Sequence, residues 1–235
     1  MQRRALRMYL AGSMNRHGAR ISNPGMPNQA LEQSRDSVLQ SVKVVGCDPL
    51  IAGVRREPQA MSAIQEQYFR DLDSDAWAVR ESAFNELFRN SADAVETLVA
   101  GASHSRPKVR AACIALMDHL GDARCCEALE RALRDPSPLV RRHAVHAVGC
   151  QKCKSHPLPM DIVGAIVERM LRDSSPRVRR VAAHQIGLQP YDPRAIEALQ
   201  HVIAVSRDAG LVSRARRALC EQMAHAEPRC AANSR

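Results

Sequence analysis

The chain has 235 residues, with 34 Lys and Arg against 25 Asp and Glu, and a formal net charge of +9. Hydrophobic residues make up 45% but aromatic residues only 3%, which favours stacked helices with small interior side chains over a thick globular core. No run of about 18 apolar residues occurs, so no membrane-spanning helix and no membrane partner are expected.

Residues 1–60 differ from the rest and are predicted to form a disordered basic tail. They hold nine Lys and Arg against four Asp and Glu, and Gly and Pro interrupt every helical pattern. No acidic residue precedes Glu32, a composition typical of mitochondrial transit peptides. A cytoplasmic location is expected, with a mitochondrial one if this segment is a transit peptide. A translation start near Met61 is another alternative.

From residue 61 to 226 the apolar pattern predicts an all-α domain of about five helix pairs, followed by a disordered tail over 227–235. The predicted first helices of the pairs are 62–72, 92–101, 123–134, 160–172 and 193–205. The predicted second helices are 76–89, 107–120, 137–149, 176–188 and 210–224. The charge is nearly balanced here, with 25 basic against 21 acidic residues over 61–235, which weakens the case for nucleic-acid binding.

The second helices are near-copies of one another. Residues 134–149 match residues 172–187 position for position, and fainter copies occur elsewhere. One apolar position recurs at intervals of 30, 31, 38 and 33 residues, at Val79, Val109, Val140, Val178 and Leu211. Such a period indicates a solenoid. Pro suits the first helical turn, and Asp135 and Asp173 are expected to brace the turn before it.

The shared pattern Asp-x-Ser-Pro-x-Val-Arg-Arg-x-Ala-x-x-x-Val/Ile-Gly resembles a HEAT repeat of the phycobilisome-lyase-like subclass, over roughly residues 61–224. The resemblance implies a right-handed α-α superhelix of the armadillo-like kind. It also implies a ladder between adjacent repeats, formed by two aspartates and by the arginine that follows each anchor valine: Asp135, Asp173, Arg110, Arg141 and Arg179. A fold of this kind specifies a scaffold and leaves the function to its surface.

The longest interval contains an insertion, residues 150–159. It carries the clearest group of potential metal-binding or redox-active side chains in the sequence. Cys150 and Cys153 form a C-x-x-C, His156 follows, and His146 lies one turn before Cys150. Two thiolates and two imidazoles are a ligand set for tetrahedral zinc. A redox pair is an alternative, although Cys150 ends a helix, where the dipole does not favour a thiolate. Two ordinary free cysteines in a polar loop are the other alternative.

A row of basic residues follows the outer face of the C-terminal second helices: Arg142, His146, Arg180, His184 and Arg217. In HEAT repeats the second helices line the concave surface, so the resemblance places this row in a groove that would attract an acidic peptide, an acidic protein surface or phosphate. A solvated helix face is the simpler alternative. The leading hypothesis is a non-enzymatic scaffold that holds an acidic protein or peptide.

Two other functions are kept as alternatives: nucleic-acid binding, and a lyase-type or oxidoreductase-associated accessory role. Enzymatic motifs are scarce. No His is followed by Glu, which removes the ligand set of HEAT-like di-iron hydroxylases, and no G-x-S-x-G or H-E-x-x-H occurs. We therefore predict no catalytic residues.

Overall fold

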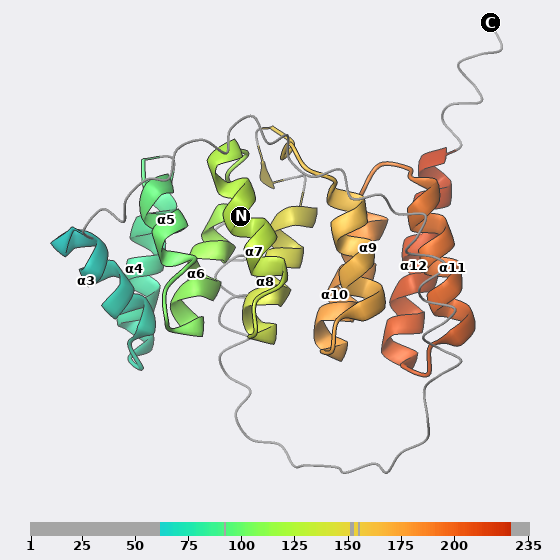
Figure 1. Cartoon of the computed structure of the whole chain (residues 1–235), viewed down its shortest axis with the longest axis horizontal. Coiled ribbons are helices and arrows are strands. Elements are labelled where there is room, and N and C mark those ends of the chain that lie inside the picture. Colours follow the sequence, from blue (N-terminus) through green and yellow to red (C-terminus); the bar gives the residue numbers. More distant parts are fainter. Residues whose placement is uncertain (1–61, 92, 151–152, 155, 227–235) are drawn as a thin grey trace, which may run out of the picture. The chain divides into compact units, whose positions relative to one another are not determined.

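The computed structural model describes residues 62–91, 93–150, 153–154 and 156–226, and in this part of the chain every regular element is a helix (Figure 1). The α-helices are α3 (Ala63–Asp73), α4 (Trp77–Arg89), α5 (Val95–Gly101), α6 (Pro107–Met117), α7 (Cys126–Leu133), α8 (Pro138–Gly149), α9 (Ile162–Arg172), α10 (Pro176–Gly187), α11 (Pro193–Val205) and α12 (Ala209–Ala226). A 3-10 turn, η2 (Ala123–Cys125), leads into α7. The predicted tails, 1–60 and 227–235, lie outside the described residues.

The predicted all-α fold and the five helix pairs are confirmed, and no helix end differs from its predicted position by more than three residues. Pro107, Pro138, Pro176 and Pro193 are each the first residue of a helix, where the missing N–H has no intrahelical partner to lose. Asp135 and Asp173 brace their turns as expected. Each accepts a hydrogen bond at 2.8 Å from the backbone N–H two residues later.

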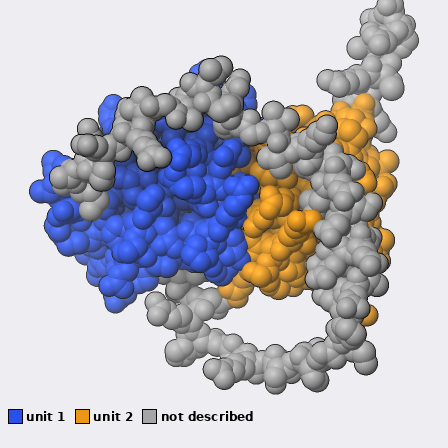
Figure 2. Space-filling view, in the orientation of Figure 1, with its two compact units in different colours: residues 1–13, 45–147, 153–160 blue, residues 14–44, 148–152, 161–235 orange. Residues whose placement is uncertain are grey.

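The described chain falls into two compact units (Figure 2). The first contains residues 62–147 and the loop 153–160, and the second contains residues 148–150 and 161–226. In the second unit α9 packs against α11 and α10 against α12, while each first helix also contacts its own partner. Small residues such as Ala182 and Ala215 are fully buried between these helices.

The recurring apolar position is buried in four of the five repeats. Val109, Val140 and Val178 are fully buried and Leu211 is 3% exposed, but Val79 is 39% exposed. The apolar residue that recurs in every repeat is therefore not a core residue in the first one. Ala83, Phe84 and Leu87 supply the buried face of α4 instead. Among the described residues no helix pair precedes α3 and α4, so the side of α4 that carries Val79 has no repeat to cover it.

One arginine is used in the same way in four repeats. The fourth residue of each second helix is Arg80, Arg110, Arg141 or Arg179, and its Nη1 donates to the backbone carbonyl oxygen six residues earlier at 2.5–2.8 Å. The same Arg110 also reaches forward: its Nε and Nη2 form a bidentate pair with the Asp135 carboxylate at 2.7 and 2.9 Å. Bidentate pairs of this kind are strong and directional. In the first unit they confirm one step of the implied ladder.

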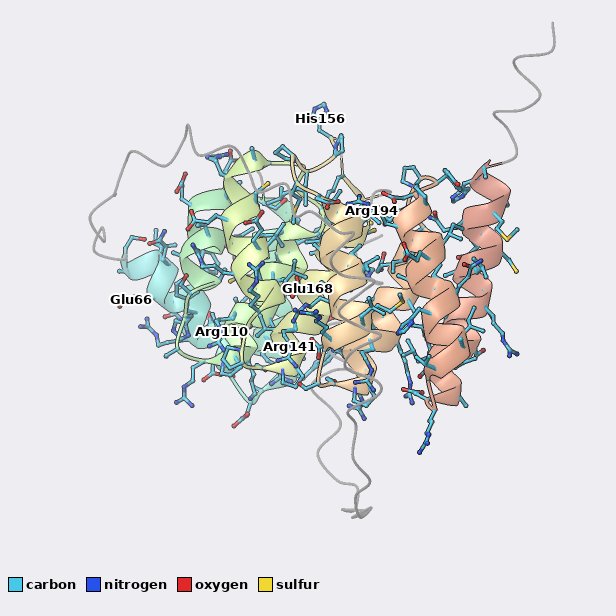
Figure 3. The ribbon with its side chains drawn as sticks, turned by 45° about the vertical axis from the view of Figure 1, so that its right-hand side comes forward. Glu66, Arg110, Arg141, His156, Glu168 and Arg194 are labelled. Carbon is cyan, nitrogen blue, oxygen red and sulfur yellow. The ribbon has the colours of Figure 1, made fainter. Side chains whose placement is uncertain are left out.

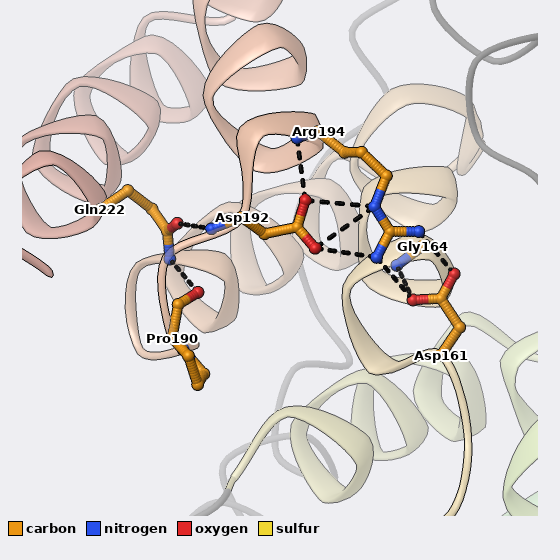
Figure 4. A network of polar contacts seen from close by, with 6 residues as sticks. All are labelled: Asp161, Gly164, Pro190, Asp192, Arg194 and Gln222. Atoms are coloured by element: carbon orange, nitrogen blue, oxygen red, sulfur yellow. Dashed lines mark hydrogen bonds and ion pairs between the residues drawn. The ribbon is translucent and has the colours of Figure 1, made fainter. Parts of the chain in front are cut away.

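The turn before α11 is tied to its neighbours by an arginine and a glutamine (Figure 4). Asp192 caps α11, and Arg194 bonds both Asp192 and Asp161, the residue that caps α9. Hydrogen bonds to Asp192 and Asp161 raise the pKa of Arg194, so the guanidinium stays charged. The fully buried Gln222 of α12 donates Nε2 to the carbonyl oxygens of Ile186, Gln189 and Pro190, and its Oε1 accepts the Asp192 N–H at 3.0 Å.

Replacing Gln222 with leucine is expected to lower the free energy of unfolding by about 2–3 kcal/mol, because buried backbone groups of the α10–α11 turn would lose their partners. Urea denaturation followed by circular dichroism measures the change. Gln200→Leu on the exposed face of α11 is the matched control and should stay within about 0.5 kcal/mol of the wild type. Equal effects of the two substitutions would contradict the structural role of Gln222.

None of the helices described is both long enough and apolar enough to cross a lipid bilayer.

Candidate functional site

Two of the predicted basic residues line a single cavity in the second unit. His184 of α10 and Arg217 of α12 border a space of about 390 Å³, together with three further residues of α12: Ser213, Arg214 and Glu221. Arg214 was not predicted to belong to this basic row, because it does not occupy the repeat positions from which the row was chosen. The sequence does contain a signal for it: Arg214 and Arg217 are three residues apart, which places both on one side of α12.

The cavity carries more positive than negative charge. Arg214 is exposed and donates only to the carbonyl oxygen of Gly210, and Arg217 makes no hydrogen bond or ion pair within the described chain. Glu221 supplies the one carboxylate among the described residues that border the cavity. Its Oε2 is buried without a hydrogen-bond partner among the described residues. A Cβ on residue 187 would lie 2.0 Å from this oxygen, so Gly187 makes room for it. The cavity thus presents two guanidinium groups around one buried acceptor.

Arg180 of the predicted row is already paired. Its Nε and Nη2 hold both carboxylate oxygens of Asp208 at 2.7–3.1 Å. Burial alone would raise the pKa of Asp208, but the hydrogen bonds from Arg180 and from the Leu211 and Gly210 amides outweigh it, and the pKa is lowered. The charge of Arg180 is therefore largely balanced inside the protein.

The other two residues of the row belong to the first unit. Arg142 is half-buried, with Nη2 3.3 Å from Nε2 of the buried His143. His146 has its Nε2 3.3 Å from Asp118 Oδ2. Both residues are half-buried, and the sequence did not show that each has an internal partner.

His146 leads to a buried cluster at the C-terminal ends of α6 and α8. Asp118 is 2% exposed, and its Oδ1 has no hydrogen-bond partner in the described chain. The Lys154 ammonium, on a side chain with no exposed surface, lies 3.5 Å from that oxygen and also donates to the Ala147 carbonyl. His119 Nε2 lies 3.9 Å from Asp118 Oδ2, and burial lowers the pKa of this imidazole. One carboxylate here balances a wholly buried cation.

One cysteine of the predicted zinc set lies beside two residues that were not predicted. Cys153 lies with Asp118 and His119, with one potential ligand atom from each within 4.8 Å of the others. His156 is exposed and points away from the helices (Figure 3). Cys150 is half-buried directly after α8 and is counted with the second unit. Asp118 and His119 were missed because they lie about 30 residues before the insertion. A zinc ion at this carboxylate would have to share it with the Lys154 ammonium.

Comparison with protein families identifies the repeat. The family described as HEAT repeats matches residues 95–158 and again residues 127–220, together more than half of the chain. A search of curated proteins gives no match. Among solved structures, a designed armadillo repeat protein is 16% identical and covers 66% of this chain and 98% of its own, with a TM-score of 0.28.

Proposed function

Because the chain belongs to the HEAT repeat family, we propose that it is a non-enzymatic scaffold that holds an acidic peptide segment of a partner protein in the α10–α12 cavity. The observation that carries the proposal is the set of basic side chains around that cavity, His184, Arg214 and Arg217. The Asp-x-Ser-Pro motif supports a place in the phycobilisome-lyase-like subclass, which names a repeat type and assigns no activity to this chain.

The charges of the cavity favour an acidic ligand. The guanidinium groups of Arg214 and Arg217 can each bind a carboxylate through two parallel hydrogen bonds. Neither group is engaged by a carboxylate among the described residues. A ligand that binds them therefore gains charge-assisted hydrogen bonds without breaking an existing ion pair.

The buried carboxylate of Glu221 argues for a peptide over a nucleic acid. A peptide offers backbone N–H groups that can donate to Glu221 Oε2, which is left without a partner in the described chain. A phosphodiester backbone has no such donor, and it would bring its own negative charge close to this oxygen. Among the described residues that border the cavity there is also no Phe, Tyr or Trp on which a base could stack.

Reversing the charge of Arg214 or of Arg217, each as a single substitution to Glu, is expected to weaken binding of a fluorescent Glu-rich peptide at least about tenfold, because close charge pairs couple by more than about 1.4 kcal/mol. Fluorescence anisotropy with the full-length protein measures the affinity. The matched control is Arg216→Glu, which changes the same charge at an exposed position of α12 that does not line the cavity.

Comparing the variants at these two positions with the control shows whether peptide binding depends on the cavity or on the net charge of the protein. An equal loss in the Arg216→Glu variant would mean that only the overall charge matters, and the proposal would fail. A labelled single-stranded oligonucleotide serves as the competing ligand. If it binds more tightly than the peptide and its affinity falls steeply with salt, the protein is a nucleic-acid binder instead.

A further inference from the structure

The repeat register breaks at one position in the second unit. Asp135 and Asp173 stand three residues before the first residue of α8 and α10. The equivalent position before α12 is Ser206. Its Oγ still accepts the N–H two residues later, from Asp208 at 3.2 Å, as the two aspartates do in their turns. Ser206 therefore keeps the turn but carries no carboxylate.

The arginine that such a carboxylate would bind is present. In the first unit, Arg110 uses Nη1 for the backbone behind it, and Nε with Nη2 for the Asp135 carboxylate of the next repeat. Arg179 of α10 makes the same backward hydrogen bond to the Asp173 carbonyl at 2.7 Å. It makes no other hydrogen bond or ion pair within the part of the chain that is described. The half of its guanidinium that corresponds to the Asp135 contact is unused.

A cavity of about 220 Å³ lies at this break, bordered by Arg179, Ser206, Arg207 and His201. The Nε2 of His201 is buried and has no hydrogen-bond partner among the described residues. Asp208 also borders the cavity, but its carboxylate is held by Arg180 and by the Leu211 N–H. Apolar side chains of Met170, Val205 and Leu211 complete the wall.

We infer that this cavity binds a carboxylate carried on a short aliphatic group. Arg179 would hold the carboxylate as Arg110 holds Asp135, with Arg207 adding charge and His201 Nε2 a further hydrogen bond. The apolar wall accepts the aliphatic part. A space of this size holds one such group and not an extended chain. The site is separate from the α10–α12 cavity, since Arg179, His201 and Ser206 do not border that cavity, and it stands whether or not a peptide binds there.

The first test uses the full-length protein and three small probes, followed by NMR through the amide signals of Ser206 and Leu211. N-acetyl-leucine represents a peptide C-terminus, N-acetyl-glutamic acid α-amide represents an acidic side chain, and N-acetyl-leucinamide has no carboxylate. At least one of the acids should bind with a Kd of about 1–10 mM, as befits so small a ligand, and the amide should not bind. Which acid binds more tightly identifies the source. Absence of saturable binding by both acids, or equal binding by the amide, overturns the inference.

In the second test, a carboxylate of the protein itself is placed in the site. Ser206→Asp introduces the residue that stands at this position before α8 and α10, so it should abolish binding of the acids and raise the melting temperature by about 2–4 °C. Arg179→Gln should weaken acid binding at least tenfold, and adding it to Ser206→Asp should remove the gain in melting temperature. Gln200→Glu adds the same charge on the exposed face of α11 and should change neither quantity. A Ser206→Asp variant that still binds the acids contradicts the site, and one that is no more stable than wild type contradicts the pairing of a carboxylate at this position with Arg179.

Discussion

Replacing Asp118 with alanine is expected to lower the free energy of unfolding by about 3–5 kcal/mol, the cost of breaking a buried ion pair from one side. The Asp118 side chain is 4% exposed and is the acidic partner of Lys154, whose side chain has no exposed surface. Without the carboxylate, the ammonium would stay in the interior, still donating to the Ala147 carbonyl oxygen but without the Asp118 charge beside it. Urea denaturation followed by the fluorescence of Trp77, the single tryptophan, reports directly on the first unit.

The matched control is an Asp–Lys pair whose carboxylate is exposed. Asp75 is 98% exposed and pairs with Lys108 at 3.0 Å, so Asp75→Ala should cost less than about 1 kcal/mol. The double variant Asp118→Asn with Lys154→Met should recover most of the loss, since it removes both charges and fills the space. A loss below about 1 kcal/mol in Asp118→Ala would show that water reaches the cluster.

Acid is expected to destabilise the first unit through His143. This residue of α8 is 4% exposed, and burial lowers its pKa to about 3, with smaller contributions from Arg142 and His146. The unfolded chain takes up the proton near pH 6.5 and the folded chain does not. The stability that His143 contributes is therefore complete above pH 6.5 and is lost as the pH falls toward 3, by about 4 kcal/mol at the lower end.

Comparing the pH dependence of stability in the wild type and in a His143 variant isolates the contribution of His143. Urea midpoints measured from pH 7 to pH 3 should fall less in His143→Gln than in the wild type, because glutamine can still accept a hydrogen bond from Arg142 but does not titrate. His184→Gln makes the same change at an exposed histidine and should leave the pH dependence as it is in the wild type. Parallel curves for wild type and His143→Gln would assign the acid sensitivity to other groups.

Local pattern was sufficient to predict the helices. Proline at the first turn, aspartate three residues before the helix, and apolar residues spaced by three and four are all local signals, and the helix ends agree closely with them. Val79 is exposed, unlike its counterparts, because the burial of this position depends on a neighbouring repeat and not on its own helix. A repeat pattern defines a position, but the position is buried only where another pair covers it.

The candidate sites were predicted less well, because their residues meet across repeats. Cys150 and His156 were predicted as zinc ligands because they are close in sequence. Asp118 and His119, which lie beside Cys153, come from the end of the preceding repeat. Likewise, the sequence showed the row of basic residues but not the ion pairs that these residues form. Arg180 meets Asp208 from 28 residues away, and no spacing rule predicts that contact.

Gly121 links the insertion to the helix pair before it. A Cβ atom on this residue would lie 2.5 Å from the carbonyl oxygen and 2.8 Å from the nitrogen of His156, so the inserted loop can rest there only on a glycine. The loop and the glycine are consequently a matched pair across more than 30 residues of chain. In any descendant of this sequence, a larger residue at 121 would be tolerated only after the insertion had been shortened or redirected. The order of those two changes during divergence is thereby constrained.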